Sequence, residues 1–367
     1  MMGRRDGWWL LITIGLAVAL FGTVTALLLS LDWTTSVSES IRTGGLVSAA
    51  VVALYALWLN DRRRRIEESR HDLERRSNEQ AREQVADERF ARAVELLGHE
   101  ADQVRVGAVH ALAGLARSRP SYVQTVLDVI CSYLRRPCDH PDYVHNRTGA
   151  RPQWEAADER DADQERQVRL AAQRVISELL LDHRQDGDKL PDLDLTGALL
   201  DYLDLSGKAI GRLVLRDAQL YGTTRLARTE INGEAWFTRA VSYGQLECDN
   251  VVFRGRSNFP HLIAHDRVSF EAAHFQQGAV FLSSEFHGPV TLAGSVFDKS
   301  VDLRRAVFRG DLNLRCTLPS PVRPGTGGMT VAPGCDVHLP DGWVVCNDGR
   351  IDLNGAPEIQ PRRTEIK

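Results

Sequence analysis

The sequence has few cysteines and no strong excess of either charge. Its six cysteines are spaced too irregularly over 367 residues to form a disulfide framework. They are Cys131, Cys138, Cys248, Cys316, Cys335 and Cys346. The formal net charge of −4 argues against a dedicated nucleic-acid-binding protein, which has a strongly basic domain, so no nucleic acid partner is expected. A hydrophobic content of 43% also argues against a wholly disordered chain.

Sequence motifs for catalysis are missing as well. There is no GxSxG, no HExxH and no complete dinucleotide-binding fingerprint. The glycines of PGTGGM, at positions 324–329, lack the Lys-Ser/Thr that completes a P-loop. We therefore expect no enzyme activity, no catalytic residue and no cofactor.

Candidate metal ligands are sparse. Asp192 and Asp194 alternate with leucines that we expect to point inward, so they are interpreted as outward, solvated carboxylates. His261 and His265 have the spacing of a helical zinc pair but no third ligand. Two looser groups without a CxxC motif are Cys131, Cys138 and His140, and Cys316, Cys335, Cys346 and His338. We expect no metal site; a membrane-bound enzyme or metal-binding protein that uses the helical domain stays open as an alternative.

Two long apolar runs occupy the first sixty residues. Residues 8–31 are 24 residues without a charge, and residues 43–59 are 17 more. About 20 apolar residues cross a bilayer as a helix. We therefore predict transmembrane spans at about 8–31 and 43–59, which form a helical hairpin over residues 1–60. The competing interpretation of the first run is a cleaved signal peptide, whose apolar part is usually only about 7–15 residues.

Basic residues flank this hairpin on one side. Arg4 and Arg5 precede the first span, and four more follow the second: Arg62, Arg63, Arg64 and Arg65. The link between the spans holds only Arg42. The positive-inside rule places both ends of the hairpin in the cytoplasm. We predict a two-span cell-membrane protein that has the lipid bilayer as a partner and cytoplasmic N- and C-termini.

A charged segment and a helical segment follow. Residues 61–89 hold nine Arg and nine Asp or Glu without Pro or Gly, which predicts a solvated helical stalk. Ile66 and Leu73 lie one heptad apart but Gln80 ends the seam, so a coiled-coil homo-oligomer stays open. Apolar residues at helical spacing predict a small helical domain over residues 90–185, with a polar loop at about 137–164.

A five-residue repeat defines the segment that begins at residue 188. One large apolar residue recurs every five positions at Leu190, Leu195, Leu200, Leu205, Ile210, Leu215 and Leu220. Later the spacing alternates between five and six, so that two interleaved series each repeat every eleven positions. They are Phe259, Phe270, Phe281, Leu292, Leu303 and Leu314, and Phe275, Phe286, Phe297 and Phe308. Between the two arrays, residues 221–252 keep only Ile231, Trp236, Val241 and Leu246, which predicts a local distortion.

A period of five matches neither a helix nor a simple strand alternation, but it matches one side of a four-sided coil. One side cannot bury its Leu or Phe alone, whereas stacked coils build a continuous inner ladder. We predict that the eleven-residue period adds one residue at a corner. The open ends of such a solenoid need covers. The helix that ends at His183 is placed at the first end, and residues 316–367 form a C-terminal cap and tail.

These residues carry a family resemblance. LTGALLDYLDLSGKAI and LRDAQL resemble the A-(D/N)-L-x-x consensus of pentapeptide-repeat proteins. FEAAHFQQGAVFLSSEF and LAGSVFDKSVDLRRAVFRGDLNL resemble the Phe-rich variant of that family. The order of two spans, a helical segment RFARAVELLGHEADQVRVGAVHALAGLAR and then repeats is similar to membrane-anchored pentapeptide-repeat proteins of actinobacteria. The resemblance implies a right-handed quadrilateral β-helix over residues 188–315, so the expected fold class is mainly a β-solenoid preceded by helices.

The function that fits these features best is a non-enzymatic, membrane-anchored scaffold that presents a cytosolic solenoid for protein–protein interaction. The expected partner is an unidentified cytosolic or membrane protein. Soluble members of the family are understood to bind gyrase by mimicking DNA with an acidic rod, which is the alternative function. Residues 190–315 hold 15 Asp or Glu against 14 Lys or Arg, and this mixed charge makes a poor phosphate mimic.

Overall fold

The computed structural model describes residues 37–150, 154–182, 189–319 and 328–353, together with isolated positions between 12 and 30. The chain divides into two compact units, Met1–Asp87 and Glu88–Lys367. Helix α2 (Val37–Leu97) begins in the first unit and ends in the second. It contains residues 61–89, the charged segment, and the four consecutive arginines that begin at Arg62.

The membrane hairpin is not supported. Among the residues that the structure describes, no helix has the length and apolarity of a membrane span. Residues 43–59, the second predicted span, lie within α2, and most of residues 8–31, the first, lie outside the described residues. Membrane anchoring therefore stays a prediction from the sequence.

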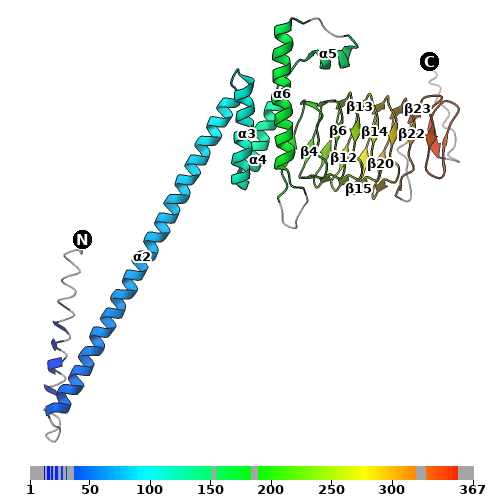
Figure 1. Ribbon diagram of the computed structural model, residues 1–367. Helices are drawn as coiled ribbons and strands as arrows, with labels where there is room; N and C mark the ends of the chain where they lie inside the picture. The colour runs from blue at the N-terminus through cyan, green and yellow to red at the C-terminus, as the bar shows by residue number, and fades with distance from the viewer. Residues whose placement is uncertain are drawn as a thin grey trace, which may run out of the picture. The chain divides into compact units, whose positions relative to one another are not determined.

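Four more α-helices and one short 3-10 helix follow in the second unit. They are α3 (Asp102–Ser118), η1 (Pro120–Tyr122), α4 (Val123–Leu134), α5 (Pro141–Thr148) and α6 (Ala156–Leu179). Fully buried side chains of α3, α4 and α6, such as Leu112, Leu127 and Ile176, pack together into one core. Figure 1 shows these helices at one end of the stacked strands.

The polar segment at 137–164 is more ordered than we predicted from its composition. The ring of His140 accepts a hydrogen bond from the backbone N–H of Asp142, and Pro141 occupies the first helical turn of α5. Gly149 ends the helix in the left-handed conformation. Helix α6 begins at Ala156, and acidic residues in its first turn oppose the positive end of the helix dipole. Capping at α5 and favourable first-turn charges at α6 thus allow helices where the low apolar content had predicted a loop.

The rest of the second unit is a parallel β-solenoid of about six turns. In the part of the chain that the structure describes, each turn adds strands to four parallel sheets, which we number I to IV. Sheet I contains β1 (Leu193–Asp194), β4 (Leu213–Val214), β8 (Ala235–Trp236), β12 (Ser257–Asn258), β16 (Ala279–Val280) and β20 (Val301–Asp302). Sheet II contains β2 (Leu199–Asp201), β5 (Gln219–Tyr221), β9 (Val241–Ser242), β13 (Ile263–Ala264), β17 (Glu285–Phe286), β21 (Val307–Phe308) and β23 (Thr330–Val331).

In each turn the chain passes from sheet I to sheet II, then through the two remaining sheets, III and IV, before it returns to sheet I. Sheet III contains β6 (Thr224–Arg225), β10 (Leu246–Glu247), β14 (Val268–Ser269), β18 (Val290–Thr291), β22 (Leu312–Asn313) and β24 (Val337–His338). Sheet IV contains β3 (Ala209–Ile210), β7 (Glu230–Ile231), β11 (Val252–Phe253), β15 (His274–Phe275) and β19 (Val296–Phe297). The repeat fold is shown; its right-handed course and quadrilateral cross-section stay predictions.

The position of the extra residue explains the change in period. Leu193 pairs with Leu213, a turn of 20 residues, whereas Leu213 pairs with Ala235, a turn of 22. The inward residues Leu200 and Leu203 are three apart across the first corner between sheets II and III, but Leu220 and Thr224 are four apart one turn later. The added residue therefore lies at this corner, and likewise between sheets IV and I.

Glycine occupies most of these enlarged corners because successive turns stack there backbone on backbone. A Cβ added to Gly244 would lie 1.7 Å from the carbonyl oxygen of Gly222, and one added to Gly233 would lie 2.8 Å from that of Gly211. The alternate corners instead hold a turn in which a residue of positive φ recurs every eleven positions. These residues are Asp217, Arg228, Arg239, Asn250, His261, Ala272, Ser283, Gly294 and Arg305.

The predicted ladder residues line the inside of the solenoid. Apart from Leu190, which is half-buried, each of them is at most 6% exposed. The phenylalanines stack across turns: Phe253, Phe275 and Phe297 form one column, with ring centroids 4.8 and 4.5 Å apart. A second column contains Phe237, Phe259 and Phe281.

The predicted distortion at 221–252 is wrong, because the strands continue through this segment. Ile231 and Leu246 point inward as the ladder requires, but several other inward positions hold small or polar side chains, such as Thr224, Ser242 and Cys248, all fully buried. Trp236 and Val241, which looked like ladder residues, occupy outward positions and are half-buried. Strand alternation gives the inward place to Ala235 and Phe237 instead.

Helical side chains cover the open edge of the first turn. The amide of Gln124 in α4 accepts the backbone N–H of Asp192 (2.9 Å) and donates to its carbonyl oxygen (3.0 Å). Gln173 of α6 accepts the N–H of Asp201 (3.1 Å), and Arg169 donates to the carbonyl oxygen of Leu199 (3.3 Å). These bonds satisfy strand groups that would otherwise be unpaired.

The far end is closed by the chain that follows the repeats. Strands β23 and β24 extend sheets II and III, and β25 (Trp343–Val345) pairs antiparallel with β26 (Ile351–Leu353). Met329, Trp343 and Ile351 are buried in the same core as the ladder. The second unit thus has one continuous hydrophobic core from the end of α2 to β26.

Candidate functional site

The candidate metal ligands serve structural roles. In the described part of the chain, no cluster of three His, Cys, Asp or Glu side chains is arranged to hold a metal ion, and all six cysteines are free. His261 lies at a positive-φ corner, while the ring of His265 stacks between Tyr243 (5.1 Å) and His287 (5.0 Å). His140 caps α5 and contacts Asp163 (2.9 Å).

The best-buried thiols are poor nucleophiles. Burial in the helical core raises the pKa of Cys131 to about 12, and burial raises that of Cys316 to about 11. Cys248 lies fully inside the solenoid, and burial there also raises its pKa well above the usual value. Because the thiolate is the reactive form, a raised pKa leaves these three cysteines with less thiolate at neutral pH than an exposed cysteine has.

Asp192 and Asp194 lie on the outside of sheet I and are used locally. Asp194 accepts hydrogen bonds from the hydroxyl (2.6 Å) and the backbone N–H (3.1 Å) of Thr196 and forms an ion pair with Arg135, the residue that follows α4. Asp192 forms an ion pair with Arg212 of the next turn (3.3 Å). The pair therefore links the first turn to its neighbours.

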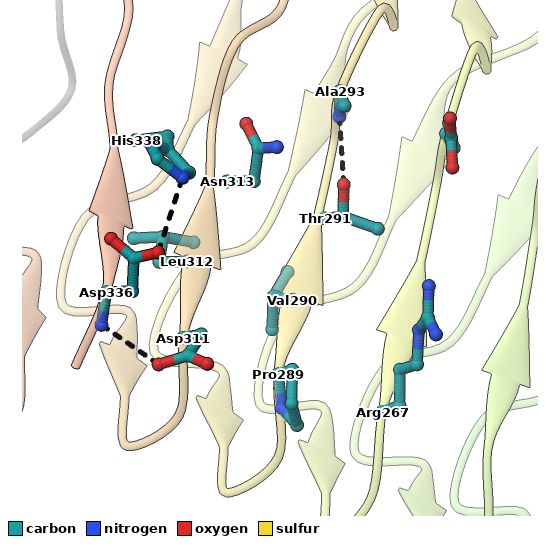
Figure 2. Close-up of a pocket in the computed structure, with 11 residues that line it drawn as sticks. Arg267, Pro289, Val290, Thr291, Ala293, Asp311, Leu312, Asn313, Asp336 and His338 are labelled. Carbon is teal, nitrogen blue, oxygen red and sulfur yellow. Dashed lines mark hydrogen bonds and ion pairs between the residues drawn. The ribbon is translucent and has the colours of Figure 1, made fainter.

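The outer face of sheet III carries a groove. It encloses about 320 Å³ and spans four successive strands, β14, β18, β22 and β24. Figure 2 shows its floor on β18, between Arg267 on one side and Asp311, Asn313, Asp336 and His338 on the other. We call this feature the sheet III groove.

The groove exists because one turn carries short outward side chains between turns with longer ones. The floor positions are Pro289, Thr291 and Ala293. In the preceding turn the corresponding outer positions are Arg267 and Glu271, and in the following turn they are Asp311 and Arg315. Since parallel strands lie about 4.8 Å apart, the backbones of the strands that carry the two walls, β14 and β22, are separated by about 10 Å.

The wall nearest the C-terminus is held by a chain of polar contacts. Arg315 contacts Nδ1 of His338 (3.2 Å), and Nε2 of the same ring lies 3.4 Å from the carboxylate of Asp336. Because a guanidinium can only donate, Nδ1 accepts and Nε2 carries the proton in the neutral ring. The backbone N–H of Asp336 donates to the carboxylate of Asp311 (2.9 Å; Figure 2).

Several charges of the groove have no opposite charge beside them. Within the described residues, neither the guanidinium of Arg267 nor the carboxylate of Glu271 forms an ion pair, and Asp311 accepts only a backbone N–H. Three carboxylates, those of Glu271, Asp311 and Asp336, thus line the groove with Arg267, while Arg315 at the end of the far wall contacts His338. The groove combines a small-residue floor with polar groups that are available to a ligand, which are features of a binding site.

Comparison of the chain with protein-family models, curated proteins and solved structures finds no match. The function must therefore be argued from the fold and from this groove.

Sequence reasoning missed the groove because it followed only the inward positions. The outward positions repeat every 22 residues in this region, as the pairing of Val268 with Val290 and of Val290 with Leu312 shows. Aligning the sequence at that period would have placed Pro-Val-Thr-Leu-Ala between two charged segments. Such an alignment would have indicated a surface depression between two charged turns.

Proposed function

We propose that this chain is a non-enzymatic scaffold of the pentapeptide-repeat type, anchored in the cell membrane by two N-terminal spans. Its right-handed, quadrilateral solenoid faces the cytoplasm, where it docks a partner protein. The apolar runs at 8–31 and 43–59 support the anchor, and the flanking arginines from Arg62 to Arg65 support the cytoplasmic orientation.

The observation that carries the docking role is the sheet III groove on a solenoid whose ends are both covered. A continuous core and covered edges make the outer faces a fixed surface, so a partner meets a site that is already formed. Unpaired polar groups in that site gain contacts on binding.

DNA mimicry is less well supported by the same surfaces. Outward carboxylates of the solenoid lie beside arginines, as in Asp217 with Arg239 (2.6 Å) and Asp302 with Arg304 (2.7 Å). A phosphate mimic needs carboxylates whose charge is not compensated by neighbouring cations.

The test is in-cell crosslinking and pull-down of the tagged full-length protein, compared with a form that begins at Asp61. Each form is tested without a substitution, with Ala293→Lys, which fills the floor of the groove, and with Gln276→Lys, a matched change on the outside of sheet IV. We expect one protein to be recovered by the full-length chain and by Gln276→Lys, and to be lost with Ala293→Lys. Recovery of no protein by any form contradicts the scaffold role, and recovery of gyrase in its place supports the alternative.

A further inference from the structure

We infer that the sheet III groove binds an extended segment of a partner protein that carries a Lys or Arg side chain. This inference names the ligand class of the docking site and rests on the proposed scaffold function. It follows from the shape of the groove, the balance of its charges and the atoms that its polar side chains leave free.

The shape of the groove fits an extended chain. The floor follows the single strand β18, and the wall on its N-terminal side runs from Arg267 to Glu271. At about 3.3 Å per residue, these five positions span about 13 Å, the length of roughly four residues of extended polypeptide. The strands that carry the walls lie about 10 Å apart, two strand spacings, which leaves room between the wall side chains for a single extended backbone.

The charges of the groove favour a basic side chain. Three carboxylates line it, at Glu271 and on the opposite wall at Asp311 and Asp336. The cations are Arg267 on the first wall and Arg315 at the end of the second, where Arg315 contacts His338, so carboxylates remain in excess. An ammonium or guanidinium placed between these carboxylates gains charge-assisted hydrogen bonds that the protein itself does not supply. An acidic segment or a nucleic acid would meet a net negative surface and be repelled.

The neutral polar groups favour a polypeptide backbone. The carboxamide oxygen of Asn313 already accepts the N–H of Arg315 (3.1 Å), and the hydroxyl oxygen of Thr291 accepts that of Ala293 (3.2 Å). The amide protons of Asn313 and the hydroxyl proton of Thr291 are therefore left for acceptors on a ligand. Figure 2 shows the amide nitrogen of Asn313 on the side of β18, over the floor of the groove.

Peptide carbonyl oxygens are the acceptors that fit these donors. They occur at every residue of an extended segment, so the two donors need no special side chain on the partner. Affinity then comes from the backbone and the cation together, while selection comes from the cation.

The experiment measures binding of two end-capped, fluorescein-labelled heptapeptides to the full-length protein in detergent micelles by fluorescence anisotropy. One peptide is Gly-Ser-Lys-Val-Arg-Ser-Gly, and the other has Glu in place of Lys and Arg. We expect the basic peptide to bind and the acidic peptide not to bind. The double variant Glu271→Gln with Asp311→Asn should weaken binding of the basic peptide at least tenfold.

The control is Glu285→Gln, which removes one carboxylate from the outer face of sheet II, away from the groove, and should leave binding unchanged. Circular dichroism of each variant checks that the solenoid is folded. Equal binding of the two peptides, or equal loss in Glu285→Gln and in the double variant, overturns the inference.

The two proposals fail separately. If the basic peptide does not bind but a partner is still recovered by Ala293→Lys in cells, the groove inference is wrong and the scaffold function stands. If the basic peptide binds selectively but no partner is recovered in cells, the scaffold function is wrong and the groove specificity stands.

Discussion

Replacing Phe275 with Ala tests the inner ladder at its most informative position. The Phe275 ring is fully buried and stacks on Phe253 (4.8 Å, 9° between planes) and on Phe297 (4.5 Å, 2°). Removing a buried Phe side chain costs about 3–5 kcal/mol, through lost burial and the cavity left behind. We expect the upper half of this range because the rings above and below are fixed by their own strands and cannot close the gap.

This free energy converts to a measurable shift in melting temperature. For folded units of a few hundred residues, 1 kcal/mol lowers the Tm by about 2–4 °C, so 4 kcal/mol predicts a decrease of about 10 °C. The assay is thermal unfolding of the full-length protein followed by circular dichroism in the β-sheet region.

The control is the next residue on the chain. Gln276 lies on the outside of sheet IV, so Gln276→Ala should change the free energy of unfolding by less than about 0.5 kcal/mol. If the two variants melt together, or if Phe275→Ala melts with the wild type, then the inward register derived for the later turns is incorrect. Phe297→Asp should be more severe, because it buries an unpaired charge in the same column.

Three further predictions concern other parts of the fold. Gly244→Ala should destabilise the solenoid by about 1–3 kcal/mol, because the new Cβ meets the backbone of the previous turn. Gly114→Ala in α3 should stabilise the protein by about 0.5–1 kcal/mol, because the Cβ there meets no atom within 4 Å. Chemical denaturation measures the sign of both changes in the free energy of unfolding. Partial burial and the neighbouring His287 lower the pKa of His265, so stability should be full above pH of about 6.5 and fall as the pH drops through the folded-state pKa; a His265→Gln variant that keeps the wild-type pH profile would contradict this. Cys131, whose pKa burial raises to about 12, should resist iodoacetamide at pH 8 until the protein is denatured, as peptide mass spectrometry of native and unfolded samples would show.

The inner ladder could be read from the sequence, because Leu and Phe are large and recur at fixed spacing. Where the inward residue is small or polar, as at Thr224 and Ser242, the sequence does not distinguish the inward position from its neighbours. Trp236 is large and apolar but lies on the outer side of its strand, so its hydrophobicity predicted the wrong side. Hydrophobicity identifies an inward position only when burial requires a large side chain. In the middle of a solenoid a small one suffices, since the neighbouring turns fix the backbone.

The helix α5 and the sheet III groove were beyond the sequence analysis for different reasons. Helix α5 depends on capping by His140 and Gly149 rather than on an apolar stripe, and only one face of it, through Tyr143, reaches the solenoid. The groove depends on the relative sizes of outward side chains in three successive turns, such as Ala293 between Glu271 and Arg315. Such a comparison requires the register to be known first.

The two covered ends give the solenoid an adjustable length. Each 22-residue turn between the covers pairs only with the turn before and the turn after it, in the same register, as Ala235 with Ser257 and Ser257 with Ala279. Gaining or losing one whole turn in this region would move the far end by about 4.8 Å while leaving both covers and every corner intact. The distance between the helical layer and a docking groove near the C-terminus is therefore a quantity that duplication or deletion can set in fixed steps, without a new core having to be designed.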